Sequence, residues 1–164
     1  MEENSLLSKE DVLLKSLYEF YNNKNNINKL LPIITGHSII SLRVLDYFVT
    51  NYAKYNNIKI INNNIPYNVH QDYKNKLKSY NKRFFDPFCR FNKNNMKNKI
   101  AFNYSNDKCI ITTIGQLNFF RWAIRYNIID YVIEYYQVIN KDINSTVKKK
   151  KIAYIKKDDT KIKI

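Results

Sequence analysis

Residues 113–126 have the sequence TIGQLNFFRWAIRY, which predicts the centre of the fold. Thr113 and Gln116 have the three-residue spacing of a capping box, a pattern that opens many helices. The residues that follow, from Leu117 to Ile124, are apolar on nearly every side of such a helix. Because a helix without a polar face is covered by its neighbours, the sequence predicts a central, buried helix over residues 114–126.

Two elements flank this helix. Residues 100–104 and 109–113 are rich in β-branched and aromatic side chains and surround an Asn-Asp pair at 106–107. This arrangement predicts a short β-hairpin. After a break at Asn127, apolar residues recur with helical spacing over residues 128–142. That periodicity predicts an amphipathic helix.

Three further helices are expected before the hairpin. Ser8 and Asp11 form a pattern close to a capping box at the start of residues 8–21. Residues 39–55 and 68–83 carry apolar side chains at intervals of three and four. Asn-rich stretches predict a polar break and a loop, at residues 22–28 and 62–66.

These elements predict a mainly α fold, a single small helical domain with one short β-hairpin. We place this domain at residues 1–143. Beyond it the helical pattern fades and lysines dominate, which predicts a disordered basic tail over residues 144–164. No apolar run reaches about 18 residues, so no membrane span is expected. The acidic start of the chain favours a cytoplasmic or nuclear protein over a secreted one.

The formal net charge of +14 is concentrated in two segments. Residues 71–100 hold nine lysines and arginines against two aspartates, a net charge of +7. Residues 148–164 hold eight lysines against two aspartates, a net charge of +6. Abundant Asn, Lys, Ile and Tyr share AT-rich codons, and that bias alone could raise the lysine count. It would not cluster the lysines, and clustering favours a polyanionic partner, foremost DNA or RNA.

The first basic segment contains the predicted contact residues. On a helix, Lys74, Lys78 and Lys82 lie at i, i+4 and i+8 and would form a stripe along one face. Lys76 and Arg83 would form a neighbouring row. Such a stripe could follow a phosphate backbone, or be an ordinary solvated face. The nucleic-acid-binding residues predicted from the sequence are Lys74, Lys76, Lys78, Lys82, Arg83, Arg90, Lys149 and Lys150.

Residues 84–91, FFDPFCRF, adjoin the stripe. Four phenylalanines beside Arg83 and Arg90 could stack on bases while the arginines hold phosphates. The alternative, which we favour, is a hydrophobic anchor that fixes a loop to the core.

The sequence predicts no enzyme, no cofactor and no metal site. Two glycines exclude a P-loop or a dinucleotide fingerprint. His37 and His70 stand outside any metal-binding pattern, which favours a structural role for both. A zinc site built from His70, Cys89 and Cys109 is the least favoured reading, because neither cysteine belongs to a Cys-x-x-Cys pair.

Three segments resemble a known group of proteins: residues 40–52, ISLRVLDYFVTNY; residues 85–90, FDPFCR; and residues 112–122, TTIGQLNFFRW. Together they resemble a family of short, basic, largely uncharacterised proteins of nucleocytoplasmic large DNA viruses of the mimivirus-like group. The resemblance spans about residues 36–136 and carries over no catalytic residue. It implies a viral protein of the infected-cell cytoplasm, at the viral factory, and packaging in the virion as a further expectation.

Three functions follow as hypotheses. The first is non-enzymatic nucleic-acid binding that is largely independent of base sequence. The second is a structural or scaffolding virion protein that docks a viral protein partner through residues 84–91 or through tyrosines such as Tyr131 and Tyr135. The third is a metal-dependent enzyme, which has the least support.

Overall fold

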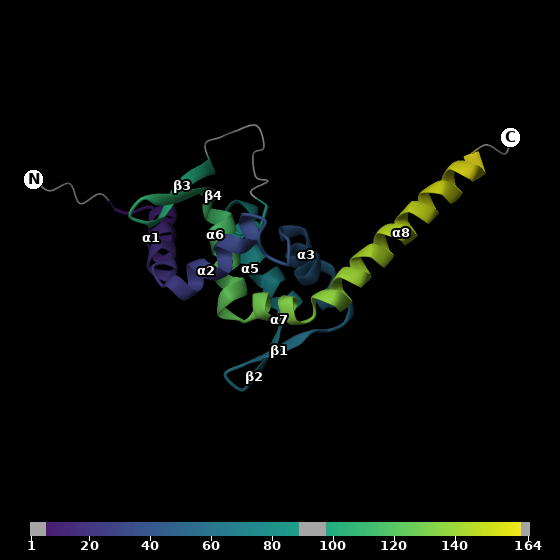
Figure 1. The fold of residues 1–164 in the computed structure, drawn as a ribbon, viewed down its shortest axis with the longest axis horizontal. Coiled ribbons are helices and arrows are strands. Elements are labelled where there is room, and N and C mark those ends of the chain that lie inside the picture. The colour runs from purple at the N-terminus through teal and green to yellow at the C-terminus, as the bar shows by residue number, and fades with distance from the viewer. Residues whose placement is uncertain (1–5, 89–97, 162–164) are drawn as a thin grey trace, which may run out of the picture.

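The computed structural model describes residues 6–88 and 98–161 and shows a mainly helical fold with two small antiparallel hairpins (Figure 1). The helices are α1 (Lys9–Tyr21), α2 (Lys24–Ile34), α3 (Leu42–Tyr47), the π-helix η1 (Phe48–Tyr52), α4 (Ala53–Tyr55), α5 (Val69–Phe84), α6 (Ile114–Arg125), α7 (Ile128–Glu134) and α8 (Tyr136–Lys161). The hairpins pair β1 (Lys59–Asn62) with β2 (Ile65–Asn68) and β3 (Lys99–Ser105) with β4 (Lys108–Thr113).

Helix α6 is the central element, as predicted. Every residue from Ile114 to Ile124 is buried, and α6 packs against α1, α2, α5, α7 and β4. Thr113 Oγ1 accepts a hydrogen bond from the Gln116 backbone N–H at 3.1 Å, which caps the helix. The Gln116 side chain donates to the Pro87 carbonyl oxygen at 2.8 Å and accepts from Thr112 Oγ1 at 2.7 Å. Gln116 therefore ties α6 to the segment after α5.

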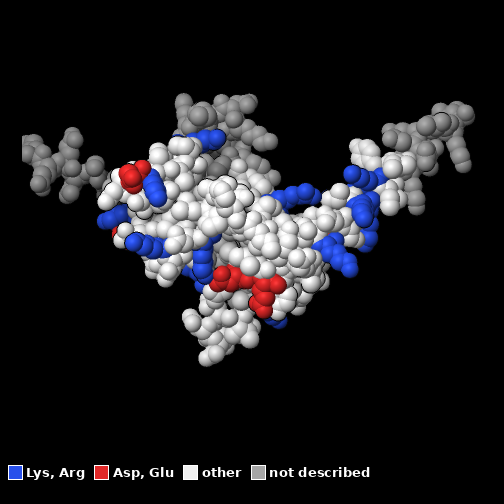
Figure 2. All heavy atoms as spheres, viewed as in Figure 1, with Lys and Arg blue, Asp and Glu red and all other residues white. Residues whose placement is uncertain are grey.

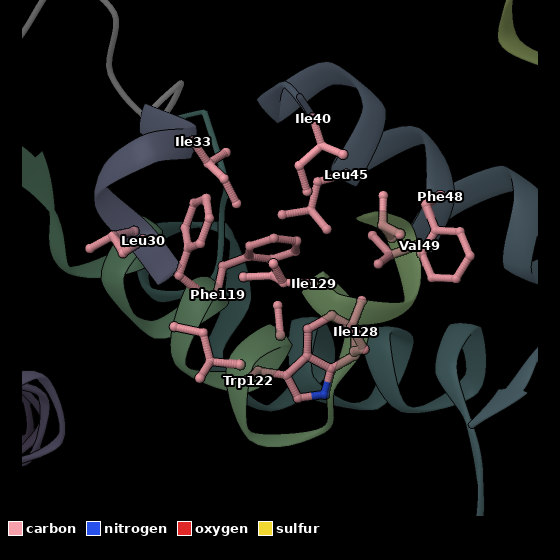
Figure 3. Close-up of a cluster of buried hydrophobic side chains, with 14 of the residues drawn as sticks. Leu30, Ile33, Ile40, Leu45, Phe48, Val49, Phe119, Trp122, Ile128 and Ile129 are labelled. Atoms are coloured by element: carbon pink, nitrogen blue, oxygen red, sulfur yellow. The ribbon is translucent and has the colours of Figure 1, made fainter. Parts of the chain in front are cut away.

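The core brings together side chains of α2, α3, α6 and α7 (Figure 3). Phe119 and Trp122 of α6 meet Ile33 of α2 and Leu45 of α3 in one apolar cluster. Ile128 of α7 completes the cluster. These side chains are almost fully buried, so hydrophobic burial holds the helices together.

Two sequence predictions about local structure are confirmed. Ser8 Oγ accepts from the Asp11 N–H and Asp11 Oδ2 accepts from the Ser8 N–H, each at 3.1 Å, which forms the reciprocal capping box of α1. The hairpin β3–β4 lies where the sequence predicted it. The predicted helix over 39–55 is present from Leu42 onward, but as α3, η1 and α4 in succession.

The prediction of one hairpin was wrong, because β1 and β2 form a second one. Asn63 and Asn64 take left-handed φ angles of 50° and 63°. Left-handed angles at both central residues define the type I′ turn, whose twist suits a two-residue hairpin.

The predicted polar break over residues 22–28 was too long. Asn23 Oδ1 accepts a hydrogen bond from the Asn25 N–H at 2.9 Å, and α2 begins at Lys24.

The disordered tail predicted from residue 144 is not what the structure shows: α8 is helical to Lys161. Its first part packs on the core through Ile139 and Ile143. The Tyr47 hydroxyl donates to Asp142 Oδ2 at 2.6 Å and fixes this part to α3. The second part projects from the body, and residues 148–155 are all exposed (Figures 1 and 2). The domain boundary at residue 143 stays a prediction.

Asparagine occupies most of the left-handed backbone positions in the described chain, and Gly36 occupies one more. Each non-glycine residue with positive φ in the described chain is an asparagine: Asn57, Asn63, Asn64, Asn81 and Asn127. Asparagine tolerates this conformation better than other L-residues because its short polar side chain bonds locally. This use of asparagine accounts for many turns in a chain with two glycines.

Candidate nucleic-acid interface

Helix α5 carries the predicted lysine stripe. Asn68 Oδ1 accepts from the Gln71 N–H at 2.9 Å and caps the helix, which then packs against α6, η1 and β2. The apolar face of α5, with Tyr73 and Leu77, packs on the core. Lys74 and Lys78 are exposed, as their position on the opposite side predicts.

The stripe ends after Lys78. Asn81 has φ 57° and ψ 177°, so the regular helix breaks there and restarts on a different axis. Lys82 and Arg83 follow this break, and they do not continue the i, i+4 row of Lys74 and Lys78. The conformation of an isolated left-handed residue inside a helix depends on tertiary packing, so the apolar periodicity of residues 68–83 could not predict the break at Asn81.

Acidic groups lie beside Lys82 and Arg83. Arg83 Nη2 forms an ion pair with Glu10 Oε2 at 3.1 Å, and both side chains are about half exposed. Lys82 and Arg83 line a small cavity of about 20 Å³ together with Glu10 and Asp86. The Arg83 guanidinium also lies 5.0 Å from the centre of the Phe84 ring. This end of the predicted surface is therefore less positive than the charge count implied.

Lys76 differs from its neighbours because it is partly buried and lines a partly enclosed cavity with Tyr80, Arg121 and Arg125. The structure thus divides the predicted residues of α5 into three settings. Lys74 and Lys78 face solvent, Lys76 borders a cavity, and Lys82 and Arg83 lie near carboxylates.

The aromatic segment after α5 includes a core anchor. Phe85 is 2% exposed and lies within 5.3 Å of Phe119 and 5.5 Å of Trp122, measured between ring centres. A base cannot stack on a ring that is enclosed in this way, so the hydrophobic anchor that we favoured is confirmed for Phe85. Phe84 is half buried. Arg90, Cys89 and Phe91 lie outside the described residues.

Helix α8 places the second group of lysines on the projecting part of the molecule. Lys148, Lys149, Lys150 and Lys151 are all exposed, and Figure 2 shows basic side chains along this arm. Lys148 and Lys149 share one side of the helix with Lys141. Within the described chain, the ion pairs are Lys29–Asp130 and Arg83–Glu10, so no described carboxylate pairs with these lysines.

The two basic groups lie on separate elements. Helix α5 packs mainly against α6 and η1, whereas α8 packs against α3, α7 and η1. The helix η1 contacts both, and the arm extends away from it. The two basic groups are therefore not parts of one continuous row of lysines.

The described residues contain few other groups that could bind a metal or react. Among them no three His, Cys, Asp or Glu side chains come together as metal ligands. His37 Nδ1 lies 2.9 Å from Thr35 Oγ1 and His70 Nδ1 lies 2.8 Å from the Val49 carbonyl oxygen, so both histidines have local partners. Cys109 is an exposed free thiol. Over the described chain, every helix is too short or too polar to cross a bilayer.

Sequence reasoning missed Arg121. This arginine is 8% exposed on the buried helix α6, where the sequence suggested an apolar surface nearly all round. Burial lowers the pKa of the guanidinium from its ordinary value, and the nearby charge of Arg125 lowers it further. An arginine within an otherwise apolar helix was the available signal, since such a charge is rarely buried without a reason.

Comparison with known proteins assigns the chain to a family. A profile described as a family of unknown function (DUF7197) matches residues 2–163. The chain belongs to this family. It is also 47% identical over 131 residues to "Uncharacterized protein L507" of Acanthamoeba polyphaga mimivirus, an alignment that covers 74% of this chain and 48% of that protein. The chain therefore spans about half the length of that relative. No solved structure matches. The resemblance to uncharacterised viral proteins of the mimivirus kind is confirmed.

Proposed function

We propose that this protein binds nucleic acid without catalysis and largely without regard to base sequence. One observation carries the proposal: Lys74, Lys78 and the run Lys148–Lys151 are exposed and unpaired with any described carboxylate. A polyanion that meets these ammonium groups gains from the release of its condensed counterions.

The spacing on α5 suits a phosphate backbone. Lys74 and Lys78 are four residues apart on one helix face, which is about 6 Å along the axis. Successive phosphates on one strand differ by about 3.4 Å in rise, and the flexible four-carbon stem of lysine covers the remaining offset. Each ammonium group could therefore approach its own phosphate without distortion of the helix. Such contacts position a protein on nucleic acid but read no sequence.

The projecting arm would extend this contact. Lysines on a helix that stands clear of the body can approach a strand from several directions. In a virus with a large DNA genome, we place this activity in the cytoplasm of the infected cell, at the viral factory, with packaging in the virion as part of the same proposal.

A salt-titrated binding assay tests the proposal. The full chain is titrated with single- and double-stranded DNA and RNA, and the slope of log K against log salt is measured. The double variant K74Q/K78Q should lower the slope by about 2, because each lost phosphate contact removes about 1. The quadruple variant of Lys148–Lys151 should lower it further.

The matched control is K15Q/K24Q, which removes two exposed lysines outside both basic segments. It should leave the slope unchanged. Equal losses in K74Q/K78Q and in the control would mean that overall charge, rather than this surface, governs binding. Unchanged affinity for every nucleic acid in both variant sets would exclude the proposal.

A protein-docking role is the second candidate. The arm exposes Ile152, Tyr154 and Ile155 at 54%, 76% and 62% of their surface. Exposed apolar groups on one short segment often mark a docking surface. Light scattering at low and high salt separates the two candidates, since a salt-resistant oligomer that forms without nucleic acid and is lost in I152S/I155S would favour docking.

A further inference from the structure

The cavity that Lys76 borders lies between helices α5 and α6. Lys76 and Tyr80 come from α5, whereas Arg121 and Arg125 come from successive turns of α6. Its volume is about 60 Å³, several times the roughly 10–15 Å³ that one water molecule needs. The cavity is therefore large enough for a small polyatomic ion.

Arg121 is held rigidly at this cavity. Its Nη1 donates to Ser16 Oγ at 2.8 Å and its Nη2 donates to Asn118 Oδ1 at 2.9 Å. Asn118 is itself fixed, since its Nδ2 donates to the Phe84 carbonyl oxygen at 2.8 Å. Neutral partners on α1 and α6 thus orient the guanidinium and leave its charge in place.

No described carboxylate neutralises this charge. The described ion pairs involve neither Arg121, Arg125 nor Lys76, and the cavity wall contains no acidic residue. Arg125 contacts the Phe20 ring at 5.2 Å from its centre, which also leaves its charge uncompensated. Buried charges in proteins are normally paired, because an unpaired one is costly.

The apolar part of the cavity wall increases the attraction between these unpaired cations and an anion. Phe85 and Trp122, both nearly fully buried, form part of the lining. Apolar surroundings reduce dielectric screening, so cations in such a place attract an anion more strongly than lysines on the open surface do.

We propose that this cavity is a binding site for a phosphate group, held by Arg121, Arg125 and Lys76. Three cations suit the charge of a phosphate monoester, and arginine is well shaped for phosphate oxygens because its N–H groups form a planar fork. The site goes beyond the surface binding proposed above, because it is a partly enclosed cavity that would hold one phosphate group rather than a strand of phosphates.

The surroundings also indicate where the rest of a ligand lies. Arg125 and Tyr126 line both this cavity and a larger groove of about 430 Å³ beside the hairpin β1–β2. Ile65 and Tyr67 form the other wall of the groove, and the Tyr67 and Tyr126 rings stack at 4.3 Å. An organic group attached to the phosphate would extend into this groove along an apolar and aromatic wall.

Calorimetry on the full chain, at constant ionic strength set with chloride, tests the site. The probes are inorganic phosphate and a nucleoside 5′-monophosphate, with the nucleoside alone as the ligand control. Wild-type protein should bind both phosphates and not the nucleoside. Arg125→Gln and Lys76→Gln should each weaken the binding roughly tenfold or more, because a charge-assisted hydrogen bond is lost.

Lys24→Gln is the control, since it removes one exposed lysine that lies outside both the cavity and the basic segments. It should bind phosphate as wild type does. Arg121→Gln should abolish binding. If this change at a buried residue impairs folding, Arg125→Gln and Lys76→Gln still test the site. The absence of saturable binding of both phosphates by wild-type protein would overturn the proposal, as would an equal loss in Lys24→Gln.

Competition identifies the source of the phosphate. If a 5′-phosphorylated oligonucleotide displaces inorganic phosphate and the unphosphorylated one does not, the site exists and its ligand is the end of a nucleic-acid strand. If the mononucleotide displaces phosphate and neither oligonucleotide does, the site exists and its ligand is a small molecule. Neither result depends on the salt slope of K74Q/K78Q, so this site and the surface proposal can fail separately.

Discussion

A single added methyl group at Gly115 is expected to destabilise the protein. A Cβ atom at this position would lie 2.8 Å from the Arg83 carbonyl oxygen and 3.3 Å from the Phe85 backbone nitrogen. The Asp86 N–H also donates to the Gly115 carbonyl oxygen at 3.2 Å. The first turn of α6 thus lies directly against the backbone that follows the kink in α5.

Two opposing effects set the magnitude for Gly115→Ala. Alanine is a better helix former than glycine, which favours the variant by up to about 1 kcal/mol. Overpacking a closely fitted site costs about 1–3 kcal/mol, and the upper part of this range applies because the obstructing atoms belong to the backbone and cannot rotate away. The free energy of unfolding should therefore fall by about 1–2 kcal/mol.

Urea and thermal unfolding, followed by circular dichroism, measure this change. A loss of 1 kcal/mol lowers the Tm of a domain of this size by about 2–4 °C. Gly36→Asn is the control for a glycine without close neighbours: a side chain at Gly36 meets nothing within 4 Å, and asparagine fits its φ of 78° better than most L-residues, so this variant should lose less stability than Gly115→Ala. A Gly115→Ala protein that is as stable as wild type, or more stable, would refute the close approach of α6 to residues 83–85.

Two further outcomes are expected. Tyr47→Phe removes the hydrogen bond to Asp142 and should cost about 1 kcal/mol, with faster amide hydrogen exchange in the first turns of α8 and no such change in the exposed Tyr55→Phe control. Burial raises the pKa of Tyr21 and of Tyr67, with Asp72 adding to the effect on Tyr67. The folded state therefore keeps these protons when the unfolded state releases them, so unfolding free energy should fall as pH rises above about 10. Urea titrations from pH 8 to pH 11 measure this fall, and a smaller slope in Tyr21→Phe identifies its source; a flat profile would contradict the buried setting of both phenols.

Much of the helical framework could be predicted because its signals are local. The capping residue Ser8, the apolar surface of α6 and the strand pattern around residues 106–107 each lie within one element. The second hairpin was missed because its turn uses Asn63 and Asn64 in place of the more familiar Asn-Gly pair, and because Pro66 lies within its second strand.

The candidate site was predictable only in part, because charge can be read from sequence whereas its surroundings cannot. The exposure of Lys74 and Lys78 followed from helical spacing. The pairing of Arg83 with Glu10 joins residues 73 positions apart, and the left-handed Asn81 depends on packing. The burial of Arg121 depends on the packing of α1 and α5 against α6, which the sequence pattern does not reveal.

The asparagines at left-handed backbone positions bear on how this family can diverge. At Asn57, Asn63, Asn64, Asn81 and Asn127 the backbone accepts asparagine, aspartate or glycine and disfavours β-branched side chains. Related sequences should therefore exchange these three residues freely in the corresponding alignment columns while valine, isoleucine and threonine stay rare there. Relatives with a different nucleotide bias could then replace asparagine with glycine and keep the same turns.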